Sequence, residues 1–448
     1  MMVHSGSLSQ VSVQEFSFDR PASFLRALRQ WTYAQNPAVF LDSNGQLNYP
    51  YRRYDALVAV GAQRTLRVPA ASNEAFTQWE KWQAQTSAWQ FGYLTYDLKN
   101  EIEDLQSAHP DHLAFPVLHF FEPEIVVEVI GDRARIHSIR QSPTQVWASI
   151  QAILQSEQGP SSPVLEGEAK LKARLSKKEY LETIQHIREH IIEGDIYEMN
   201  FCQEFYLEEV KLNPTRAFER LNAIGQAPFS SYFRVDDQYI LCASPERFLA
   251  KRGKQIISQP IKGTRPRHAD PVIDQSYAEQ LLQSEKDRAE NVMIVDLVRN
   301  DFARSCQPGS VQVEELFGIY SFELVHQMIS TVTGTLRPEV SFLKALKAAF
   351  PMGSMTGAPK VMTMQLIEQY ERSRRGVYSG AIGYIRPDGD ADFNVVIRSL
   401  LYNASKQYLS FQVGGAIVYD SQPEEEYTEC LVKAKGLLET LGLPTSSF

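Results

Sequence analysis

Cysteine is scarce in this sequence of 448 residues, which contains only Cys202, Cys242, Cys306 and Cys430. The four lie far apart and form no C-x-x-C pair, which argues against both a disulfide framework and a cysteine-ligated zinc site. We therefore expect a protein of the reducing cytosol.

Long apolar runs and an excess of basic charge are also missing. No stretch approaches the roughly 20 apolar residues that cross a bilayer, and the N-terminus "MMVHSGSLSQ" has no basic segment followed by an apolar one. The 45 basic and 54 acidic residues give a net charge of -9, which argues against a general nucleic-acid or anionic-membrane surface. With 43% hydrophobic residues, we expect a soluble, cytoplasmic, globular protein that meets any anionic ligand with local cations.

The patterns that are present predict a mixed α and β protein. "AWQFGYLTYDL" and "PEIVVEVIG" have the composition of strands, whereas "ASFLRALRQW" has helical periodicity. The polar stretch 156–170 is rich in Ser, Pro and Gly and predicts a linker between an N-terminal region, 1–155, and a larger region, 171–445. In the larger region, "KKEYLETIQHIREHIIEGD" predicts a helix that ends at Gly194, and "YILCASPERFLA" and "DFNVVIRSLLY" predict strands.

Two groups of acidic residues lie on predicted helices. In "SEKDRAENVMIVDLVRND", Asp287 and Glu290 are three residues apart and so share one helix face. In "PEEEYTECLVKAKGLLETLG", Glu426, Glu429 and Lys433 share one face in the same way. If the two helices meet, their carboxylates form an all-oxygen site that suits Mg²⁺. The alternative is a pair of solvated charged turns, and the sequence alone leaves both open.

Further features predict local structure around these helices. Ser421 is a predicted N-cap, with Pro423 in the first helical turn. The glycines of "FPMGSMTGAPK" and "QVGGAIVYDS" predict turns, either plain ones or turns whose backbone N–H groups face an anion. Arg398, in the apolar run "NVVIRSLL", is predicted to lie in a strand core, where it needs an anionic ligand or an internal ion pair. Glu246 lies beside Pro245 at a predicted strand break.

Several motifs occur together in one order along the chain: "SPERF", "PIKGT", "KDRAENVMIVDLVRNDFAR", "GSMTGAPK", "GAIGY", "VVIRS" and "GGAIVYDSQPEEEYTEC". Between Gly194 and Gly436 this series resembles the chorismate-utilising enzymes. The N-terminal "LDSNGQLNYPYRRYDALVAVG" is a weaker match to the amino-terminal region of that family. The resemblance implies an α/β (α+β) fold with packed antiparallel β-sheets inside and helices on the outside.

The resemblance also implies a site for chorismate and Mg²⁺. Glu290 and Glu429 match the residues that ligate the metal, and the metal holds the ring carboxylate of chorismate. Asp287 and Glu426 match residues in or next to the metal's coordination shell, and Lys433 adds positive charge near the ring carboxylate. The other matched positions are Tyr378 and Arg398, which hold the enolpyruvyl carboxylate, and Gly263, Thr264, Gly414 and Gly415, which line the substrate.

The lysine of "PIKGT", Lys262, distinguishes two branches of the family. Anthranilate synthases carry alanine at this position, whereas lysine marks the aminodeoxychorismate synthases. By resemblance, Lys262 attacks C2 of chorismate and the C4 hydroxyl leaves, after which ammonia enters at C4 and expels the lysine. The attack requires a neutral amine, so we expect burial or a neighbouring cation to lower the pKa of Lys262. Glu246, of "SPERF", is the candidate general acid for the departing hydroxyl, and later the base for the incoming ammonia.

Two positions depart from the family pattern. Glu198, in "GDIYEMNF", stands where relatives that use ammonia usually carry glutamine and those that use water carry lysine. Ala416 replaces the third glycine of the usual substrate turn. The segments "YPYRRYD" and "APFSSYF" resemble parts of a tryptophan pocket found in some relatives. The residues that would form such a pocket here are Ser43, Tyr51, Tyr54, Pro228, Phe229 and Ser230.

The source of ammonia is missing from this sequence. A class I glutaminase needs a cysteine nucleophile in a glycine-bounded turn and a His-x-Glu pair, and no histidine here is followed by x-Glu. We therefore expect a separate glutamine amidotransferase subunit as partner. The expected activity is conversion of chorismate and ammonia to 4-amino-4-deoxychorismate, on the route to 4-aminobenzoate and folate. The alternatives are component I of an anthranilate synthase and a catalytically silent regulator that binds chorismate or tryptophan.

Overall fold

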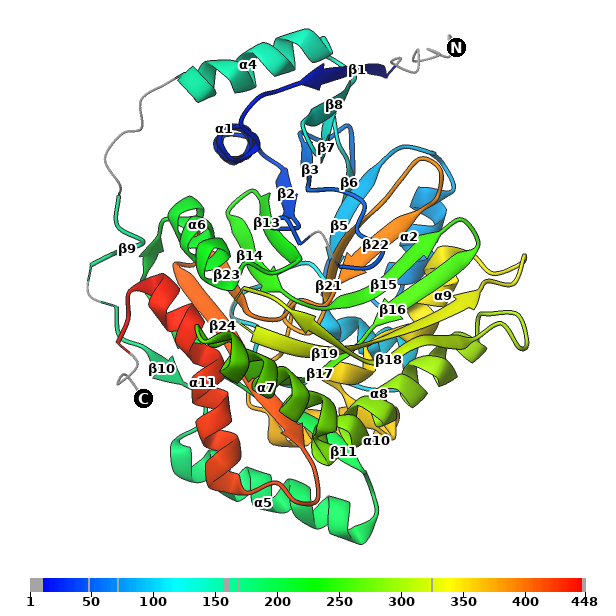
Figure 1. Cartoon of the computed structure of the whole chain (residues 1–448), viewed down its shortest axis with the longest axis vertical. Coiled ribbons are helices and arrows are strands. Elements are labelled where there is room, and N and C mark those ends of the chain that lie inside the picture. Colours follow the sequence, from blue (N-terminus) through cyan, green and yellow to red (C-terminus); the bar gives the residue numbers. More distant parts are fainter. Residues whose placement is uncertain are drawn as a thin grey trace.

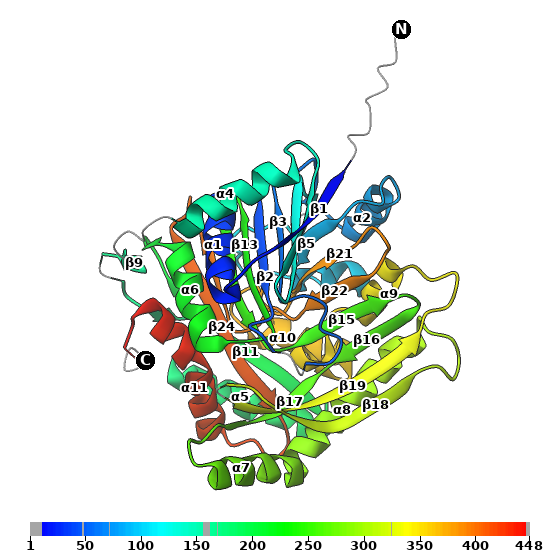
Figure 2. The same ribbon diagram turned by 45° about the horizontal axis from the view of Figure 1, so that its top comes forward.

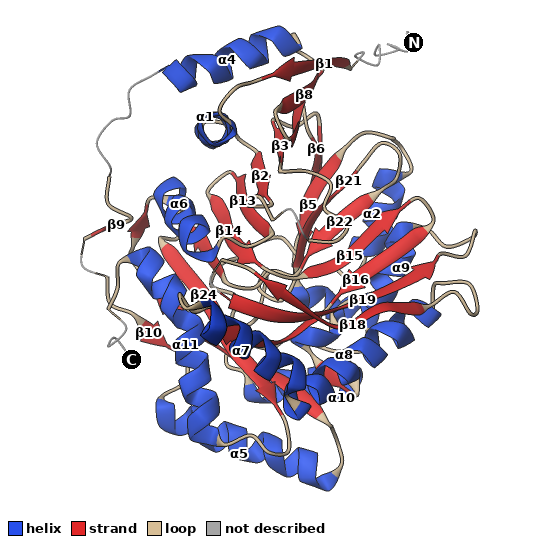
Figure 3. Cartoon of the chain, viewed as in Figure 1, coloured by secondary structure: helices blue, strands red, loops and turns tan. Residues whose placement is uncertain are grey.

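Two large β-sheets form the inside of the protein, and helices cover their outer sides (Figures 1 and 3). The structure is a computed structural model that describes residues 11–46, 49–70, 72–155, 162–167, 169–323 and 325–444. Neighbouring strands in both sheets run antiparallel. The predicted fold of packed antiparallel sheets with outer helices is confirmed.

The first sheet contains twelve strands, which come from both ends of the chain. β2 (Ala38–Asp42) pairs with β13 (Phe229–Val235), and β11 (Glu198–Leu207) pairs with β24 (Tyr408–Ile417). The other strands of this sheet are β1 (Ser12–Ser17), β3 (Ala56–Val60), β7 (Ile125–Ile130), β8 (Arg133–Ser138), β10 (Lys172–Ala173), β14 (Gln238–Ser244), β20 (Gly357–Ala358) and β23 (Ser399–Asn403).

The second sheet contains ten strands and also combines distant segments. β5 (Gln90–Leu94) pairs with β21 (Ala381–Ile385), and β17 (Ile261–Pro266) pairs at one edge with β19 (Val325–Thr335). The other strands of this sheet are β4 (Arg64–Val68), β6 (Leu118–Glu122), β15 (Arg247–Arg252), β16 (Gln255–Gln259), β18 (Gln312–Ser321) and β22 (Ala391–Asn394). A separate two-stranded pair is formed by β9 (Leu165–Glu166) and β12 (Lys211–Leu212).

Each sheet contains strands from both predicted regions. The β2–β13 pair shows this for the first sheet and the β5–β21 pair for the second. The predicted linker, 156–170, lies partly outside the described residues, and the domain boundary stays a prediction.

The helices that matter for the site are α5 (Lys177–Glu193), α8 (Glu285–Ala303) and α11 (Pro423–Leu441). α11 packs on β24 and α5, while α8 packs on β17 and β19 (Figure 2). α5 ends at Gly194 as predicted, and this glycine has a left-handed φ of 88°.

No helix of the described residues is long and apolar enough to cross a membrane. The other helices are α1 (Pro21–Tyr33), α2 (Ala75–Gln83), α3 (Lys99–Ile102), α4 (Pro143–Gln155), α6 (Pro214–Gly225), α7 (Pro271–Gln283), α9 (Phe342–Ala349) and α10 (Lys360–Tyr370), with short 3₁₀ turns η1 (Tyr96–Leu98) and η2 (Gly353–Met355).

Buried apolar side chains form one core between the sheets and another on the outer face of the first sheet. Successive residues of β3 supply both, because side chains alternate along a strand. Leu57 packs in the core that includes Phe91 of the second sheet, whereas Val58 packs in the core that includes Phe24 of α1 and Leu437 of α11. The first sheet is therefore buried on both faces at its centre.

The prediction that Arg398 lies in a strand core is wrong. β22 ends at Asn394 and β23 begins at Ser399, so Arg398 lies in the bend between them, with a φ of 51°. Its side chain is exposed.

Two further local predictions near the site are also wrong. Gly414 lies inside β24 and not in a turn, and a Cβ there would clash with the carbonyl oxygen of Phe201 on β11. Glycine is thus required for the close approach of two strands. Ser421 does not cap α11, because Gln422 precedes the helix and the Ser421 hydroxyl donates to Glu426 instead.

Candidate active site

Glu198 and Lys262 form an ion pair between the two sheets. Glu198 begins β11 in the first sheet, Lys262 lies in β17 at the edge of the second, and Lys262 Nζ is 2.6 Å from Glu198 Oε1. The side chain of Glu198 is fully buried and that of Lys262 is 10% exposed. Because a buried charge needs local compensation, each residue stabilises the other in its charged form.

The surroundings of Lys262 favour its ammonium form. Burial lowers the pKa of Lys262, but three carboxylates outweigh burial and raise the pKa above its ordinary value. These carboxylates belong to Glu198, Glu290 and Glu246. The expectation of a lowered pKa is therefore wrong, because the neighbours of Lys262 are acidic. The amine must lose a proton before it can act as a nucleophile.

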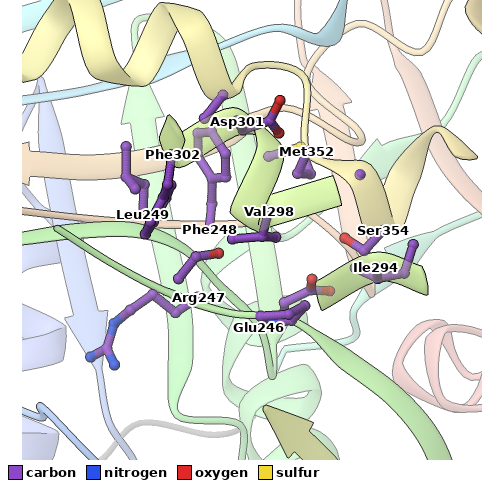
Figure 4. Close-up of a pocket in the computed structure, with 14 residues that line it drawn as sticks. Glu246, Arg247, Phe248, Leu249, Ile294, Val298, Asp301, Phe302, Met352 and Ser354 are labelled. Carbon is purple, nitrogen blue, oxygen red and sulfur yellow. The ribbon is translucent and has the colours of Figure 1, made fainter. Parts of the chain in front are cut away.

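Glu246 lies in the turn between β14 and β15, where its charge and that of Lys262 interact. It is 5% exposed, and burial raises the pKa of its carboxyl group to about 7, although Ser354 and Lys262 act in the opposite direction. Figure 4 shows the Glu246 side chain at one end of a cavity, near Ser354 and Ile294, with Asp301 at the other end. A carboxyl group with this pKa is partly protonated at neutral pH and can donate a proton, as the predicted general acid must.

Glu246→Gln should make the stability of the protein less dependent on pH. The folded-state pKa of about 7 lies above the ordinary value of 4.5, so wild-type stability falls as the pH rises from 4.5 through about 7. Glutamine cannot ionise and avoids this loss. The free energy of unfolding of the variant, relative to wild type, should rise by about 2 kcal/mol between about pH 5 and about pH 8 in urea titrations. A relative stability that stays constant with pH would contradict a buried, titrating Glu246.

The predicted acidic groups lie beside two glycines from the two sheets. A Cβ at Gly263 of β17 would lie 2.9 Å from Asp287 Oδ1 on α8. A Cβ at Gly415 of β24 would lie 3.2 Å from Glu426 Oε2 and 3.7 Å from Glu429 Oε1 on α11. Side chains at these glycines would therefore fill space next to the carboxylates.

Lys286 links the two helices electrostatically. Burial raises the pKa of Glu290 to about 7, and the charges of Lys262 and Lys286 partly oppose this. The charge of Lys286 on α8 also acts on Glu426 and Glu429 of α11. The acidic residues of both helices thus share one neighbouring cation. Because burial disfavours ionised Glu290, a divalent cation at this place would stabilise it, and the all-oxygen donor set fits Mg²⁺.

The carboxylates of α8 and α11 do not converge as three protein ligands of one ion would. In the described part of the chain, only His190, Glu193 and Asp195 bring three ligand atoms within 4.8 Å of one another. This cluster is largely exposed, and His190 already pairs with Asp195. The α8 and α11 carboxylates instead suit an ion held by few protein oxygens and completed by water and ligand oxygens, as is common for Mg²⁺.

The predicted substrate-lining residues come from both sheets. Gly263 has a left-handed φ of 89°, and Thr264 follows it with an exposed side chain. Lys433 Nζ lies 2.9 Å from the carbonyl oxygen of Gly414 and 2.7 Å from Glu429 Oε1. The Lys433 charge lowers the pKa of Glu429, so the Glu429 carboxylate stays ionised at neutral pH. Ala416, at the third glycine position, fits within β24 opposite Asn200.

The two residues predicted to hold the enolpyruvyl carboxylate differ in their surroundings. Tyr378 is buried, and its hydroxyl lies 3.4 Å from Cys202 Sγ. Among the described residues, no carboxylate lies at ion-pair distance from Arg398, so the internal ion pair considered from the sequence is not formed. The charge of Glu246 does act on Arg398. This guanidinium is therefore available for an anionic ligand near Glu246.

A second cavity is lined by residues of both sheets, among them Leu41 of β2 and Ile382 of β21. Five of the six residues predicted for a tryptophan pocket line it, namely Ser43, Tyr54, Pro228, Phe229 and Ser230. Tyr51 does not line it, because its hydroxyl donates to Glu314. The arginines along the cavity already have aspartate partners, in the pairs Arg52–Asp55, Arg53–Asp390 and Arg247–Asp392. Tryptophan binding stays a prediction.

Sequence reasoning assigned no role to two residues of the site. Ser354 lies near Glu246 and lowers the pKa of its carboxyl group, and the charge of Lys286 acts on acidic residues of both α8 and α11. Both stand inside quoted motifs, "GSMTGAPK" and "KDRAENVMIVDLVRNDFAR", and this was the available signal.

Comparison with known proteins identifies the family. A family model described as chorismate binding enzyme matches residues 27–439. The chain is 41% identical to aminodeoxychorismate synthase component 1 of Klebsiella aerogenes over 290 residues, which are 65% of this chain and 64% of that protein, just under two thirds of its length. It is 34% identical to anthranilate synthase component 1 of Thermus thermophilus over 356 residues, which are 78% of this chain and 76% of that protein.

The fold is also similar to a solved structure. The crystal structure of anthranilate synthase component I from Streptococcus pneumoniae superposes with a TM-score of 0.72 and 26% identity, covering 87% of this chain and 93% of that one. The family model matches most of the sequence, so this chain belongs to the chorismate-binding enzymes and is a chorismate-utilising enzyme.

Proposed function

We propose that the protein is component I of an aminodeoxychorismate synthase and converts chorismate and ammonia to 4-amino-4-deoxychorismate. The observation that carries the proposal is the largely buried Lys262. By resemblance, anthranilate synthases carry alanine at this position. The charges of Lys262 and Glu246 interact within one buried site. A nucleophile and a proton donor in such proximity are what a covalent displacement needs.

The proposed reaction has two displacement steps. In the first, the neutral amine of Lys262 forms a bond to C2 of chorismate, the ring double bonds shift, and the C4–O bond breaks. Glu246 gives its proton to the departing hydroxide, which leaves as water. In the second, ammonia forms a bond to C4, and the C2–N bond breaks with its electron pair returning to Lys262. The Glu246 carboxylate then takes a proton from the new C4 ammonium group and regains its starting form.

The remaining residues would hold the two carboxylates of chorismate. Glu290 and Glu429 would bind Mg²⁺, with Asp287 and Glu426 beside them, and the bound ion would neutralise the ring carboxylate. Arg398 offers an exposed guanidinium to the enolpyruvyl carboxylate. The site thus supplies cations locally in a protein whose net charge is -9.

Product identity tests the proposal. Purified protein is incubated with chorismate, Mg²⁺ and ammonium, and the product is identified by mass and chromatography. We expect 4-amino-4-deoxychorismate. Anthranilate as the product would favour the rival function, anthranilate synthase component I, and binding of chorismate without conversion would favour a silent regulator.

The isolated chain should use ammonium but not glutamine. All four cysteines are buried, and burial raises the pKa of Cys242 and of Cys306 to about 11 and that of Cys430 to about 12. Such thiols are poor nucleophiles, and Cys202 has a raised pKa for the same reason. Turnover with glutamine should appear only when a separate glutamine amidotransferase subunit is added. Glutamine-dependent turnover by the pure chain would reveal an unrecognised glutaminase site.

A further inference from the structure

Glu198 is the residue of the site whose role the family resemblance leaves open. It is the first residue of β11, and it pairs with Ala358 of β20. A Cβ at Gly357 would clash with the carbonyl oxygen of Glu198, so the two strands are in very close contact here. The backbone that carries the Glu198 side chain is therefore held in place.

The two carboxylate oxygens of Glu198 have different environments. Oε1 accepts a hydrogen bond from Lys262 Nζ at 2.6 Å. Oε2 is buried and has no hydrogen-bond partner among the described residues. Oε2 therefore keeps an acceptor site that none of the described residues fills.

Three carboxyl groups face Lys262, each from a different element. They are Glu198 from β11, Glu246 from the turn between β14 and β15, and Glu290 from α8. Within the described residues, only Glu198 lies at hydrogen-bond distance from Lys262. Glu246 must keep its proton for the departing hydroxide, and Glu290 is a proposed metal ligand. Glu198 is therefore the proton acceptor that the geometry offers.

We propose that Glu198 is a positioning residue that holds Lys262 and takes a proton from its ammonium group before the amine attacks chorismate. This inference rests on the proposed function. One N–H bond of Lys262 breaks, the electron pair stays on nitrogen, and the proton forms an O–H bond with Glu198, so no further reactant is needed. When ammonia expels the lysine, the neutral amine takes the proton back and the ion pair is restored.

Glu198→Gln tests this role, because the amide has nearly the same shape but cannot accept the proton. Chorismate consumption is measured in single turnovers, with saturating ammonium and Mg²⁺, for wild type and variant over a range of pH. At about pH 7 the variant should be about 100-fold slower. Its lysine must now lose the proton to solvent, so the ratio of wild-type to variant rates should fall about tenfold for each unit of pH increase. Glu246 titrates in both proteins, and saturating Mg²⁺ keeps Glu290, whose pKa the Glu198 charge helps to raise, ionised in both.

Glu204→Gln is the matched control. Glu204 is buried on the same strand and pairs with Arg174 at 2.7 Å, and six residues along β11 place it about 20 Å from Glu198. This variant should keep the wild-type rate at every pH. Glu198→Asp retains a carboxylate and should lose less activity than Glu198→Gln.

Two results would overturn the inference. A large rate ratio that is constant with pH would mean that Glu198 only maintains the shape of the site. A ratio near one at every pH would mean that Lys262 needs no internal proton acceptor. Failure of the proposed function is visible separately, because it changes the identity of the wild-type product, whereas the ratio is read from chorismate loss whatever the product.

Discussion

Lys262→Ala should slow the formation of 4-amino-4-deoxychorismate by about 100-fold or more, because the variant lacks the amine that forms the bond to C2. With C2 free, ammonia can add there, and part of the product should be anthranilate or its precursor. High ammonium concentrations should restore part of the 4-amino product by direct attack at C4. The products are separated by chromatography and identified by mass.

The same substitution leaves Glu198 buried without its ion partner. An uncompensated buried charge costs about 3–5 kcal/mol, so Lys262→Ala should also lower the free energy of unfolding. The double variant Lys262→Ala/Glu198→Gln removes the charge and should recover stability without recovering activity, which separates the chemistry from folding. Normal rate and product in Lys262→Ala would show that this lysine is structural.

Glu290→Gln should remove most of the activity, and wild type should lose its activity when a chelator removes Mg²⁺. Glutamine keeps the size of the side chain but loses the charge that a hard cation prefers. The Mg²⁺ concentration for half-maximal rate should rise by more than about 10-fold. Mutation of a residue that only hydrogen-bonds to a metal ligand already lowers metal affinity by about 10-fold. The fold should survive, because a neutral amide avoids the burial cost that raises the pKa of Glu290 to about 7. A magnesium titration of the initial rate measures the effect.

Asp296→Asn is the matched control for this substitution. Asp296 lies on the same helix, α8, but its side chain is 73% exposed and pairs with Arg299. Its replacement should change neither the rate nor the magnesium dependence. If Glu290→Gln or Glu429→Gln kept full activity in the presence of chelator, the assignment of the metal ligands would be wrong.

The features that could be predicted from sequence have local causes. Helix geometry places residues three apart on one face, so Asp287 and Glu290 could be paired without knowledge of the fold. Gly194 marks the end of α5 because glycine readily takes the left-handed conformation found there. The break at Glu246 between two strands followed from the adjacent proline.

The features that could not be predicted arise where distant segments meet. Glu198 and Lys262 are 64 residues apart in the sequence. They come together because the two sheets, which contain β11 and β17, meet at the site. Burial of Lys262, which lowers its pKa, was foreseeable. The acidic groups that raise this pKa come from three other elements of the fold. Arg398 was misplaced because apolar residues flank the bend on both sides, and the periodicity of "NVVIRSLL" carries no sign of it.

The pairing of β5 with β21 has a consequence for biosynthesis. β5 and one of its partners, β6, are translated early, but the other partner of β5, β21, is translated only near the end of the chain. β2 likewise pairs with β13, which is translated much later. Until those partners emerge, the nascent N-terminal strands present unpaired backbone edges, which readily join the edges of other chains. The second sheet therefore closes only after most of the polypeptide has been made.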